Sequence, residues 1–274
     1  NGALVFGAGN EITNSTTTIS APSSGGASAK ELQTNLMTSI RASQSGGATL
    51  AIGGGNKADY TQKTSIIGVN NTVTGKSSDI SQYNNVTGFN NTATNVDNAT
   101  VIGTNRTLSD LSDTIVIGSA DSTIATTASN AVAIGSNSNV TVDGGVALGS
   151  DSVASVDKGV AGTVPTGATV SDTDKASATW TSTLGAVSVG VPGTNVAATQ
   201  TRQITGVAAG TQATDAVNVA QLNAVNTRLT NTVDANKIHF FHVNSTSGTN
   251  YDNDGAKGTD SIAIGKSSTA ADNS

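Results

Sequence analysis

The residues of this chain that could bind a metal ion lie near its C-terminal end. His239 and His242, the only two histidines, are spaced to share one face of a helix, but no third ligand follows at the spacing of a zinc site. Residues 250–255 contain the Asn, Asp and Gly of the first half of a calcium-binding loop, yet Ser261 stands where such a loop needs a bidentate Glu. An aromatic junction and a polar turn account for these residues more simply, so the sequence predicts no metal site.

Residues that could support phosphate binding or catalysis are also incomplete. Residues 75–77 read Gly-Lys-Ser, but six residues separate Gly68 from Gly75 where a phosphate-binding loop has four. Asp172 and Asp174 are close in sequence, but they have no apolar surroundings that would tune them for acid–base catalysis. No Gly-x-Ser-x-Gly elbow marks a nucleophile. We therefore expect a protein that is not an enzyme and that binds no cofactor.

The elements that would have to position such groups are built from one repeated unit, a short apolar run that ends in glycine. The run recurs every 14 to 17 residues, apart from one step of 20 between Gly68 and Gly88. Its glycines are Gly53, Gly68, Gly88, Gly103, Gly118, Gly135 and Gly149. A fixed period of this kind means that each repeat buries its apolar side by stacking on its neighbours. The chain is therefore predicted to be a solenoid.

Both faces of the repeated strand are apolar. Side chains alternate along a strand, so the residue before each glycine and the residue two before it point to opposite faces. The first set, with Val189 of a later strand, comprises Ile52, Ile67, Ile102, Ile117, Ile134 and Leu148. The second set comprises Ala51, Ile66, Val101, Val116, Ala133 and Ala147. A coil interior covers only one face and identical chains can cover the other, so we expect the first set to form the core of the solenoid or of an oligomer.

A weaker apolar position follows five residues after several glycines. It is occupied by Val73, Ala93, Leu108, Val140 and Ala154. Between the two apolar positions lie Asn, Thr, Ser and Gly, which turn the chain because they tolerate left-handed backbone or bond their own main chain. Each repeat is therefore predicted to be a strand, a turn, a shorter strand and a second turn, with coils about 4.8 Å apart.

The composition limits the partners. The chain has 274 residues, of which 3% are aromatic and 12% charged, and this does not suit a large conventional core. Its net charge of −6 includes no basic cluster, so nucleic acid is not an expected partner. No apolar run approaches the roughly 18 residues that span a bilayer, and the first residues do not look like a signal peptide. We expect any membrane anchor to lie outside this fragment.

The glycine pattern gives way to a helical one after Arg202. Residues 202–210 read Arg-Gln-Ile-Thr-Gly-Val-Ala-Ala-Gly, and residues 214–222 read Thr-Asp-Ala-Val-Asn-Val-Ala-Gln-Leu. Leu222, Val225 and Leu229 then recur at alternating steps of three and four, which is the seam of a coiled coil. The seam covers under two heptads, and a helix of that length is marginal alone.

These strings resemble a known family. Residues 131–135 (Ala-Val-Ala-Ile-Gly) and 261–265 (Ser-Ile-Ala-Ile-Gly) resemble the head repeats of trimeric autotransporter adhesins, the YadA-like surface proteins of Gram-negative bacteria. Residues 202–222 are similar to the neck of that family, and residues 158–180 to its head insert motif. The resemblance implies an all-β fold with a short α segment: a left-handed parallel β-roll in each chain of a homotrimer, followed by a neck and a short trimeric coiled coil.

The resemblance also assigns residues to the neck. They are Arg202, Ile204, Val207, Asp215, Val217, Val219 and Leu222, and the coiled coil continues at Val225 and Leu229. Arg202 and Asp215 are candidates for an ion pair between chains. The alternative is two exposed charges that contribute little to stability.

We expect the following order along the chain: a partial head repeat and a Ser/Thr/Gly-rich insertion with a short helix (1–47), head repeats (48–150), the head insert motif (151–183), a last head strand (184–200), the neck (201–225), a short coiled coil (226–238), and a junction that begins a second head (239–274). The helix is expected between residues 30 and 43, where apolar residues recur at helical spacing.

The function implied by the resemblance is attachment by a fibre on the bacterial cell surface, projecting from the outer membrane. Host cells, extracellular matrix, glycans or other bacteria would be bound through multivalent contacts, with specificity in the two insertions. One alternative is a passive spacer within the fibre, and another is a carbohydrate-active enzyme on a parallel β-helix. A third, ice binding by Thr-x-Thr arrays, has the pattern in two coils, at residues 72–74 and 92–94.

Overall fold

The computed structural model describes residues 3–15, 28–42, 49–193, 199–235, 256–265 and 267–272. The chain divides into two compact units, Asn1–Ile204 and Thr205–Ser274. The first unit contains the strands, and the second contains the helix α3 (Val219–Ala235). Most of the repeated sequence and most of the predicted neck therefore fall into different units.

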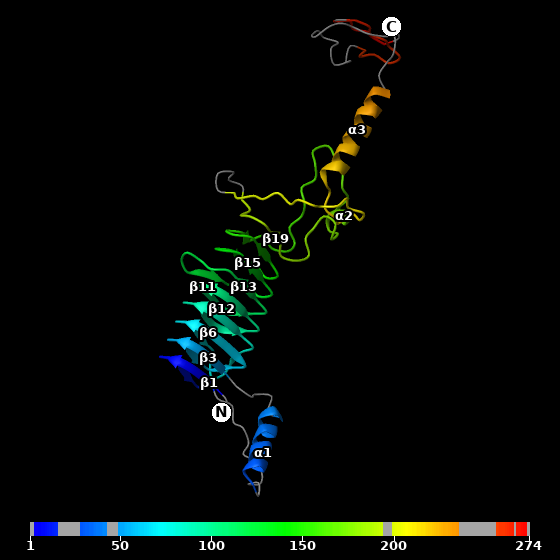
Figure 1. Cartoon of the computed structure of the whole chain (residues 1–274). Helices are drawn as coiled ribbons and strands as arrows, with labels where there is room; N and C mark the ends of the chain where they lie inside the picture. Colours follow the sequence, from blue (N-terminus) through cyan, green and yellow to red (C-terminus); the bar gives the residue numbers. More distant parts are fainter. Residues whose placement is uncertain are drawn as a thin grey trace. The chain divides into compact units, whose positions relative to one another are not determined.

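The repeats form parallel sheets wound into a roll, in which successive coils each add a strand to the larger main sheet and most add one to the smaller main sheet (Figure 1). The nine strands of one sheet follow chain order: β1 (Leu4–Ala8), β3 (Thr49–Gly54), β6 (Thr64–Val69), β9 (Asn85–Phe89), β11 (Thr100–Thr104), β13 (Ile115–Ile117), β15 (Val132–Ile134), β17 (Val146–Leu148) and β19 (Val187–Ser188). The six strands of the other are β2 (Glu11–Thr13), β4 (Lys57–Asp59), β7 (Thr72–Thr74), β10 (Thr92–Asp97), β12 (Arg106–Ser112) and β14 (Ile124–Thr126). The predicted parallel β-roll is confirmed.

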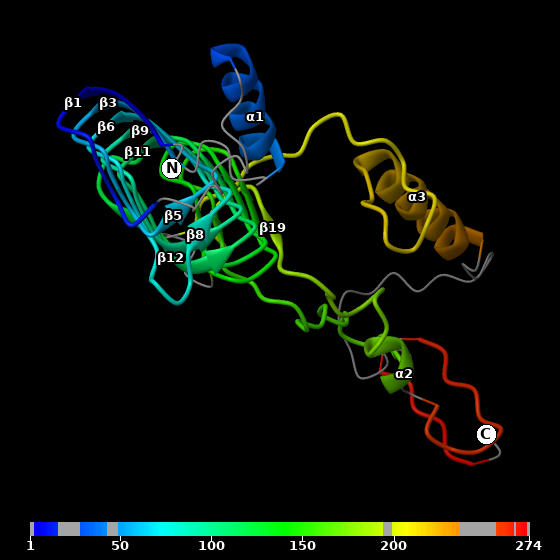
Figure 2. The same ribbon diagram turned by 90° about the horizontal axis from the view of Figure 1, so that it is seen from below.

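Two short pairs complete the coils. They are β5 (Thr61–Gln62) with β8 (Ser81–Gln82), and β16 (Asn139–Val140) with β18 (Val153–Ala154). Figure 2 shows β12 across the coils from β6, β9 and β11, so the two main sheets enclose the interior between them.

The interior of the roll is filled by two facing columns of small apolar side chains. The residue two before each glycine is buried, as in Ile66, Val101 and Val116. The residue five after the glycine faces it and is also buried, as in Val73 and Leu108. In β10 and β12 a second apolar residue, Val96 and Leu111, is also buried. Ala, Val, Ile and Leu fill the interior, and larger anchors are absent from these columns.

The first set of predicted core residues lies on the outer face of the nine-stranded sheet. Ile67, Ile102, Ile117, Ile134 and Leu148 are 37–41% exposed, and Ile52 and Val189 are half-buried. These residues are therefore not part of the interior of a single roll, because the second set occupies it. Their packing between chains stays a prediction.

The repeated glycine is required by the close stacking of coils. Gly53, Gly68, Gly88 and Gly103 pair with one another in register along the nine-stranded sheet, and each has a φ between +125° and +148°. A Cβ built on Gly53 would overlap the carbonyl oxygen of Gly68 in the next coil, and the same relation repeats up the stack. An L side chain is therefore excluded by both backbone conformation and space.

A ladder of buried polar side chains runs along the corner that follows each glycine. Asn56, Asn71 and Asn91, each three residues after a glycine, are at most 1% exposed. The side-chain NH₂ of Asn71 donates to the carbonyl of Gly88 at 2.9 Å, and its Oδ1 accepts the backbone N–H of Asn91 at 3.2 Å. Each Asn thus satisfies backbone groups of the next coil. We call this column the inner ladder.

Arg106 continues the inner ladder and is fully buried. Its Nε donates to the carbonyl of Gly118 at 2.8 Å, and its terminal nitrogens donate to the carbonyls of Gly135 at 3.1 Å and Ser138 at 2.6 Å. Burial lowers the pKa of this guanidinium. The coil that follows Arg106 has an enlarged corner, since Arg106 pairs with Ile124 while Ile102 pairs with Ile117. The long side chain spans that irregular coil and reaches the one beyond it.

Three longer connections extend out of the roll. They follow β2, β7 and β18, and each leads toward the next strand of the nine-stranded sheet. The first contains α1 (Ala29–Ala42), where the sequence predicted a helix. The second, residues 75–80, makes the 20-residue step and turns tightly between Lys76 and Asp79. The third lies between β18 and β19. Because β18 still pairs with β16, this connection begins after Ala154, and β18 lies within the range 151–183 predicted for the head insert motif.

In the second unit, α3 begins at Val219, so the predicted boundary between neck and coiled coil at residue 225 falls inside one helix. Residues 261–265, predicted to begin a second head, do not form a strand. An isolated parallel bridge joins Ala256 and Ala270, and Ser268 donates to the carbonyl of Gly265 at 2.8 Å as Ser138 does to Gly135 at 2.9 Å. These contacts form the corner of a single coil, and the described residues contain no second coil stacked on it. His239, His242 and residues 250–255 lie outside them.

Adjacent glycines in β3 test the steric origin of the repeat. We expect Gly53→Ala to lower the free energy of unfolding by about 3 kcal/mol, because its Cβ collides with the next coil and its φ is positive. Gly54→Ala should have a small effect, since its Cβ would meet the carbonyl oxygen of Ala8 at an ordinary 3.6 Å. Urea unfolding of both variants at equal protein concentration measures the difference, and equal midpoints would contradict the account.

Candidate trimer interface and neck

The outer face of the nine-stranded sheet is uncharged and mostly apolar, with polar side chains such as Asn85 and Thr87 in β9. None of its strands contains Asp, Glu, Lys or Arg. Its exposed side chains form columns in register, with Ile102, Ile117, Ile134 and Leu148 next to one another on successive coils. A contiguous apolar surface without charges has the composition of the centre of a protein interface.

The six-stranded sheet differs in composition. Its strands include charged residues such as Glu11, Lys57, Asp59 and Asp110. Thr72, Thr92 and Thr107 align in register, as do Thr74, Thr94 and Ser109, so hydroxyl groups cover its outward face over three coils. The charge and the hydroxyl groups thus identify this sheet as the water-facing side of the roll.

Helix α3 has no buried residue. Leu222, Val225, Leu229 and Val233 follow one stripe and are 55–62% exposed. Ile204, Val217 and Val219 of the predicted neck are exposed as well, and Val207 is half-buried. A helix of this length that buries nothing within its own chain has its apolar stripe free for partner helices.

The loop before α3 is held by side-chain to backbone hydrogen bonds. Asn218 precedes the first residue of α3, and its Oδ1 accepts the backbone N–H of Gln221 at 3.0 Å. Gln221 reaches back to the backbone N–H of Asn218 at 3.3 Å, which completes a capping box. The amide of Gln221 also bonds both the N–H and the carbonyl of Gly210, at 3.1 and 3.0 Å. Sequence reasoning missed this pair, although Asn-x-x-Gln before an apolar run is its signature.

The charged neck residues have partners within their own chain. One carboxylate oxygen of Asp215 accepts the backbone N–H groups of Thr211 at 2.9 Å and Gln212 at 3.0 Å, and these bonds lower the pKa of Asp215. Arg202 donates to the carbonyl and hydroxyl of Ser150, the hydroxyl of Ser152 and the carbonyl of Val189. An ion pair between Arg202 and Asp215 of different chains stays a prediction.

Comparison with known proteins agrees with this arrangement. Residues 203–238 match the family model of the coiled stalk of trimeric autotransporter adhesins. A 46-residue segment is 65% identical to autotransporter adhesin BadA of Bartonella henselae, covering 17% of this chain and 1% of that protein.

The chain carries a trimeric autotransporter adhesin stalk segment. The matched residues include the capping box and the apolar stripe of α3, which are the parts of the second unit that sequence and geometry single out. The similarity is to the stalk of this family and covers this short segment, which the roll precedes in the sequence.

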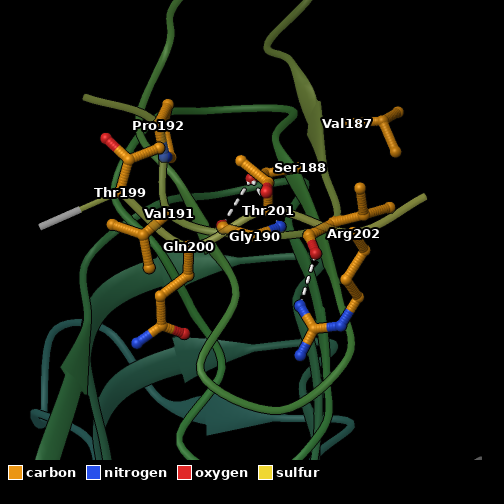
Figure 3. A pocket seen from close by; sticks show the side chains of 10 residues that line it. Val187, Ser188, Gly190, Val191, Pro192, Thr199, Gln200, Thr201 and Arg202 are labelled. Carbon is orange, nitrogen blue, oxygen red and sulfur yellow. Dashed lines mark hydrogen bonds between the residues drawn. The ribbon is translucent and has the colours of Figure 1, made fainter. Parts of the chain in front are cut away.

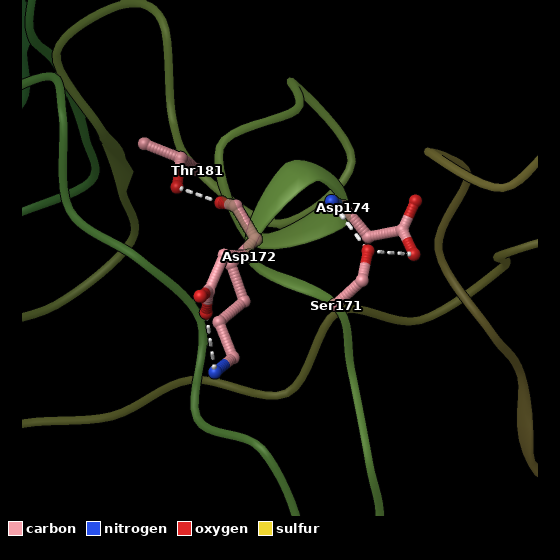
Figure 4. Close-up of polar contacts among 5 residues, drawn as sticks. Ser171, Asp172, Asp174 and Thr181 are labelled. Carbon is pink, nitrogen blue, oxygen red and sulfur yellow. Dashed lines mark hydrogen bonds and ion pairs between the residues drawn. The ribbon is translucent and has the colours of Figure 1, made fainter.

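The insert between β18 and β19 carries the acidic pair Asp172 and Asp174, and these charges are used locally. Ser171 caps the short helix α2 (Asp172–Lys175): its hydroxyl accepts the N–H of Asp174 at 3.1 Å and donates to the Asp174 carboxylate at 2.6 Å (Figure 4). Lys175 pairs with Asp172 at 3.4 Å. Asp172 and Asp174 are exposed. The pair therefore stabilises a turn of helix on the surface of the insert.

Other features of the described residues are consistent with a binding or structural segment. No cluster of three His, Cys, Asp or Glu side chains is found in this part of the chain. A hollow of about 250 Å³ lies beside β19, and Val191, Gln200 and Arg202 are among its lining residues (Figure 3). None of the helices described here has the length and apolar character of a membrane span.

The pH dependence of the neck loop tests the role of Asp215. The folded state lowers its pKa below the ordinary 3.8, so its contribution to stability is present above that pH and is lost as the pH falls through the folded-state pKa. We expect the amide NMR signals of Thr211 and Gln212 to move together as the pH falls from neutral to about 2. Asp215→Asn should abolish this titration and Asp113→Asn should leave it intact. A titration that survives in the Asp215 variant would refute the assignment.

Proposed function

We propose that this chain is the head and neck of a trimeric adhesin on a bacterial surface, anchored in the outer membrane by another part of the protein. Three chains would pack the outer faces of their nine-stranded sheets around a common axis and join their α3 helices in a coiled coil. Each roll would be left-handed. No cofactor is required in this arrangement, and nucleic acid is not a partner.

One observation carries the proposal. Exposed apolar side chains such as Ile102, Ile117 and Ile134 are aligned on the outer face of a sheet whose strands contain no charged residue, while charged residues lie in the strands of the six-stranded sheet. A solvated sheet would show polar side chains on its outer face, as the six-stranded sheet does. Identical chains provide a covering surface of matching size, and the stalk segment belongs to a family described as trimeric.

Attachment is the function we assign to the water-facing parts of the trimer. The insert of residues 155–186 has no buried residue, and Val160 and Leu184 are among its exposed apolar side chains. Such a loop on a stiff scaffold can contact a receptor without disturbing the scaffold. Binding would gain strength from three copies per fibre and many fibres per cell, with host cells, matrix, glycans or other bacteria as receptors.

The alternatives have less support. A carbohydrate-active enzyme needs free paired carboxylates in a groove, whereas Asp172 and Asp174 cap and brace α2 on the surface. Ice binding needs a long flat hydroxyl array, but Lys57 and Asp59 replace the threonines in β4 and limit the array to three coils. A passive spacer remains the alternative that an adhesion experiment decides.

Sedimentation velocity tests the trimer. We expect the chain, of 27.0 kDa, to sediment with three times that mass. The double variant Ile117→Asp and Ile134→Asp should sediment as a single chain, because a carboxylate in a dry interface costs several kcal/mol per copy. Thr92→Asp with Thr94→Asp, on the six-stranded sheet, is the matched control and should remain trimeric. A folded wild-type monomer would overturn the proposal.

Whole-cell adhesion tests the insert. The hydroxyl of Ser182 lies 3.5 Å from the carbonyl oxygen of Asp157, so a short Gly-Ser turn can replace residues 158–181 without straining the roll. We expect cells displaying this variant to lose about tenfold or more of their adhesion, while the trimer mass is unchanged. Removal of residues 76–80, which restores a 15-residue step, is the control and should preserve adhesion. Unchanged adhesion in the insert variant would favour the spacer.

A further inference from the structure

The roll ends at β19 because the chain reverses there. After β19, Val191 and Gln200 form an antiparallel bridge, with the N–H of Val191 donating to the carbonyl of Gln200 at 2.9 Å. Gly190 is buried at the start of this reversal, and a Cβ on it would overlap the carbonyl oxygen of Gln200. The returning segment therefore packs against the last coil and places Arg202 next to that coil.

Arg202 binds the corner that follows the last repeated glycine. Its guanidinium donates to the carbonyl of Ser150 at 2.6 Å and to the hydroxyl of Ser152 at 3.0 Å, and it also reaches the carbonyl of Val189. The guanidinium lies over Gly149, since a Cβ built there would be 3.1 Å from the guanidinium carbon. Ser152, three residues after Gly149, occupies the inner-ladder position of its coil.

Arg106 provides an internal comparison. Both arginines lie where the next regular coil is missing: Arg106 faces the enlarged corner after Gly118, and Arg202 faces the end of the stack. Both direct the guanidinium at backbone carbonyls of the glycine corner. Neither is in the ion pairs of the described residues, which are Lys76–Asp110 and Lys175–Asp172. A guanidinium suits this task because its donors form a rigid fork that binds several acceptors at once.

We propose that Arg202 is the terminal rung of the inner ladder. It satisfies the carbonyl groups that a further coil would otherwise bond, and so fixes where the roll stops and where the neck departs. Arg202 is thus a positioning residue that the neck sequence contributes to the head. This role is independent of the proposed trimer and of receptor binding, since every contact lies within one chain.

The role also explains why the last strand does not remain an open edge. Exposed strand edges pair with other chains and promote aggregation, and proteins cover them. Here the antiparallel return from Val191 to Gln200 lies over the end of the last coil, and Arg202 holds that return by bonds on both sides of Gly149. Removal of the guanidinium would release the return while leaving the earlier coils paired.

Hydrogen exchange of the full chain, followed residue by residue, tests this role. In Arg202→Ala we expect the amides of Val153, bonded to Gly190 at 2.8 Å, and Val191 to exchange at least about tenfold faster, while Val101 in the middle of the roll is unchanged. Arg202→Lys should restore only part of the protection, because one ammonium cannot reach all the acceptors. Arg228→Ala in α3 is the matched control and should leave all three rates unchanged.

Two outcomes would overturn the proposal. The first is unchanged exchange at Val153 and Val191 in both Arg202 variants, and the second is faster exchange that extends equally through the roll. A double-mutant cycle of Arg202→Ala with Ser152→Ala adds a second measurement, in which independent effects of the two changes on the Val153 rate would contradict direct contact. Sedimentation of each variant separates loss of this rung from loss of the trimer.

Discussion

The stacking distance of the coils is the constraint on which the rest of the structure depends. Parallel strands that hydrogen-bond in register lie about 4.8 Å apart, and at the corner after each strand this brings successive backbones into direct contact. Gly68, Gly88 and Gly103 are the residues at that contact, and each has the positive φ that turns the chain into the corner. The period of the sequence is therefore the length of chain needed to return to the same contact. The Asn residues of the inner ladder then satisfy the backbone groups that the sharp corner leaves without strand partners.

The same geometry makes the roll too thin to be stable by its interior alone. The buried apolar side chains of the interior are small or of medium size, and Ala51, Ala133 and Ala147 are among them. Burial of apolar area is the main favourable term in folding, so a narrow interior of small residues contributes little per residue. The outer face of the nine-stranded sheet carries larger side chains, including Ile117 and Ile134, and it is uncharged. Apolar volume that the interior cannot hold has thus been placed on the outside of one sheet, where another chain can bury it.

The sequence predicted the roll because glycine spacing and alternation are local properties that each repeat displays. It also indicated the apolar position five residues after the glycine, where Val73 and Leu108 stand among polar turn residues, and the structure places these side chains inside. It did not reveal which of two apolar faces is inside, because alternation alone is symmetric between Ile66 and Ile67. Arg106 could not be assigned from sequence either. The buried guanidinium of Arg106 is bound by the backbone carbonyls of Gly118 and Gly135, which lie 12 and 29 residues further along the chain. Every residue has a backbone carbonyl, so residue types alone cannot indicate these acceptors.

The two connections of each coil differ in how much change they accept, and this places functional variation on one side of the roll. At the glycine corner, the glycine carbonyl and the side chain of the inner ladder must lie at fixed positions. Among the described coils one such corner is longer than the others, and there the side chain of Arg106 spans the gap to the next coil. The other connection also contains buried polar contacts, such as those of Asn84 with the carbonyl of Val96 and the N–H of Ala99. Nevertheless α1, the turn at residues 75–80 and the insert of residues 155–186 leave and re-enter there without shifting the strand register. Loops of different length and sequence can therefore be exchanged at that connection while the stack is preserved. A fibre that must keep its shape and vary what it touches gains both properties from this asymmetry within a single coil.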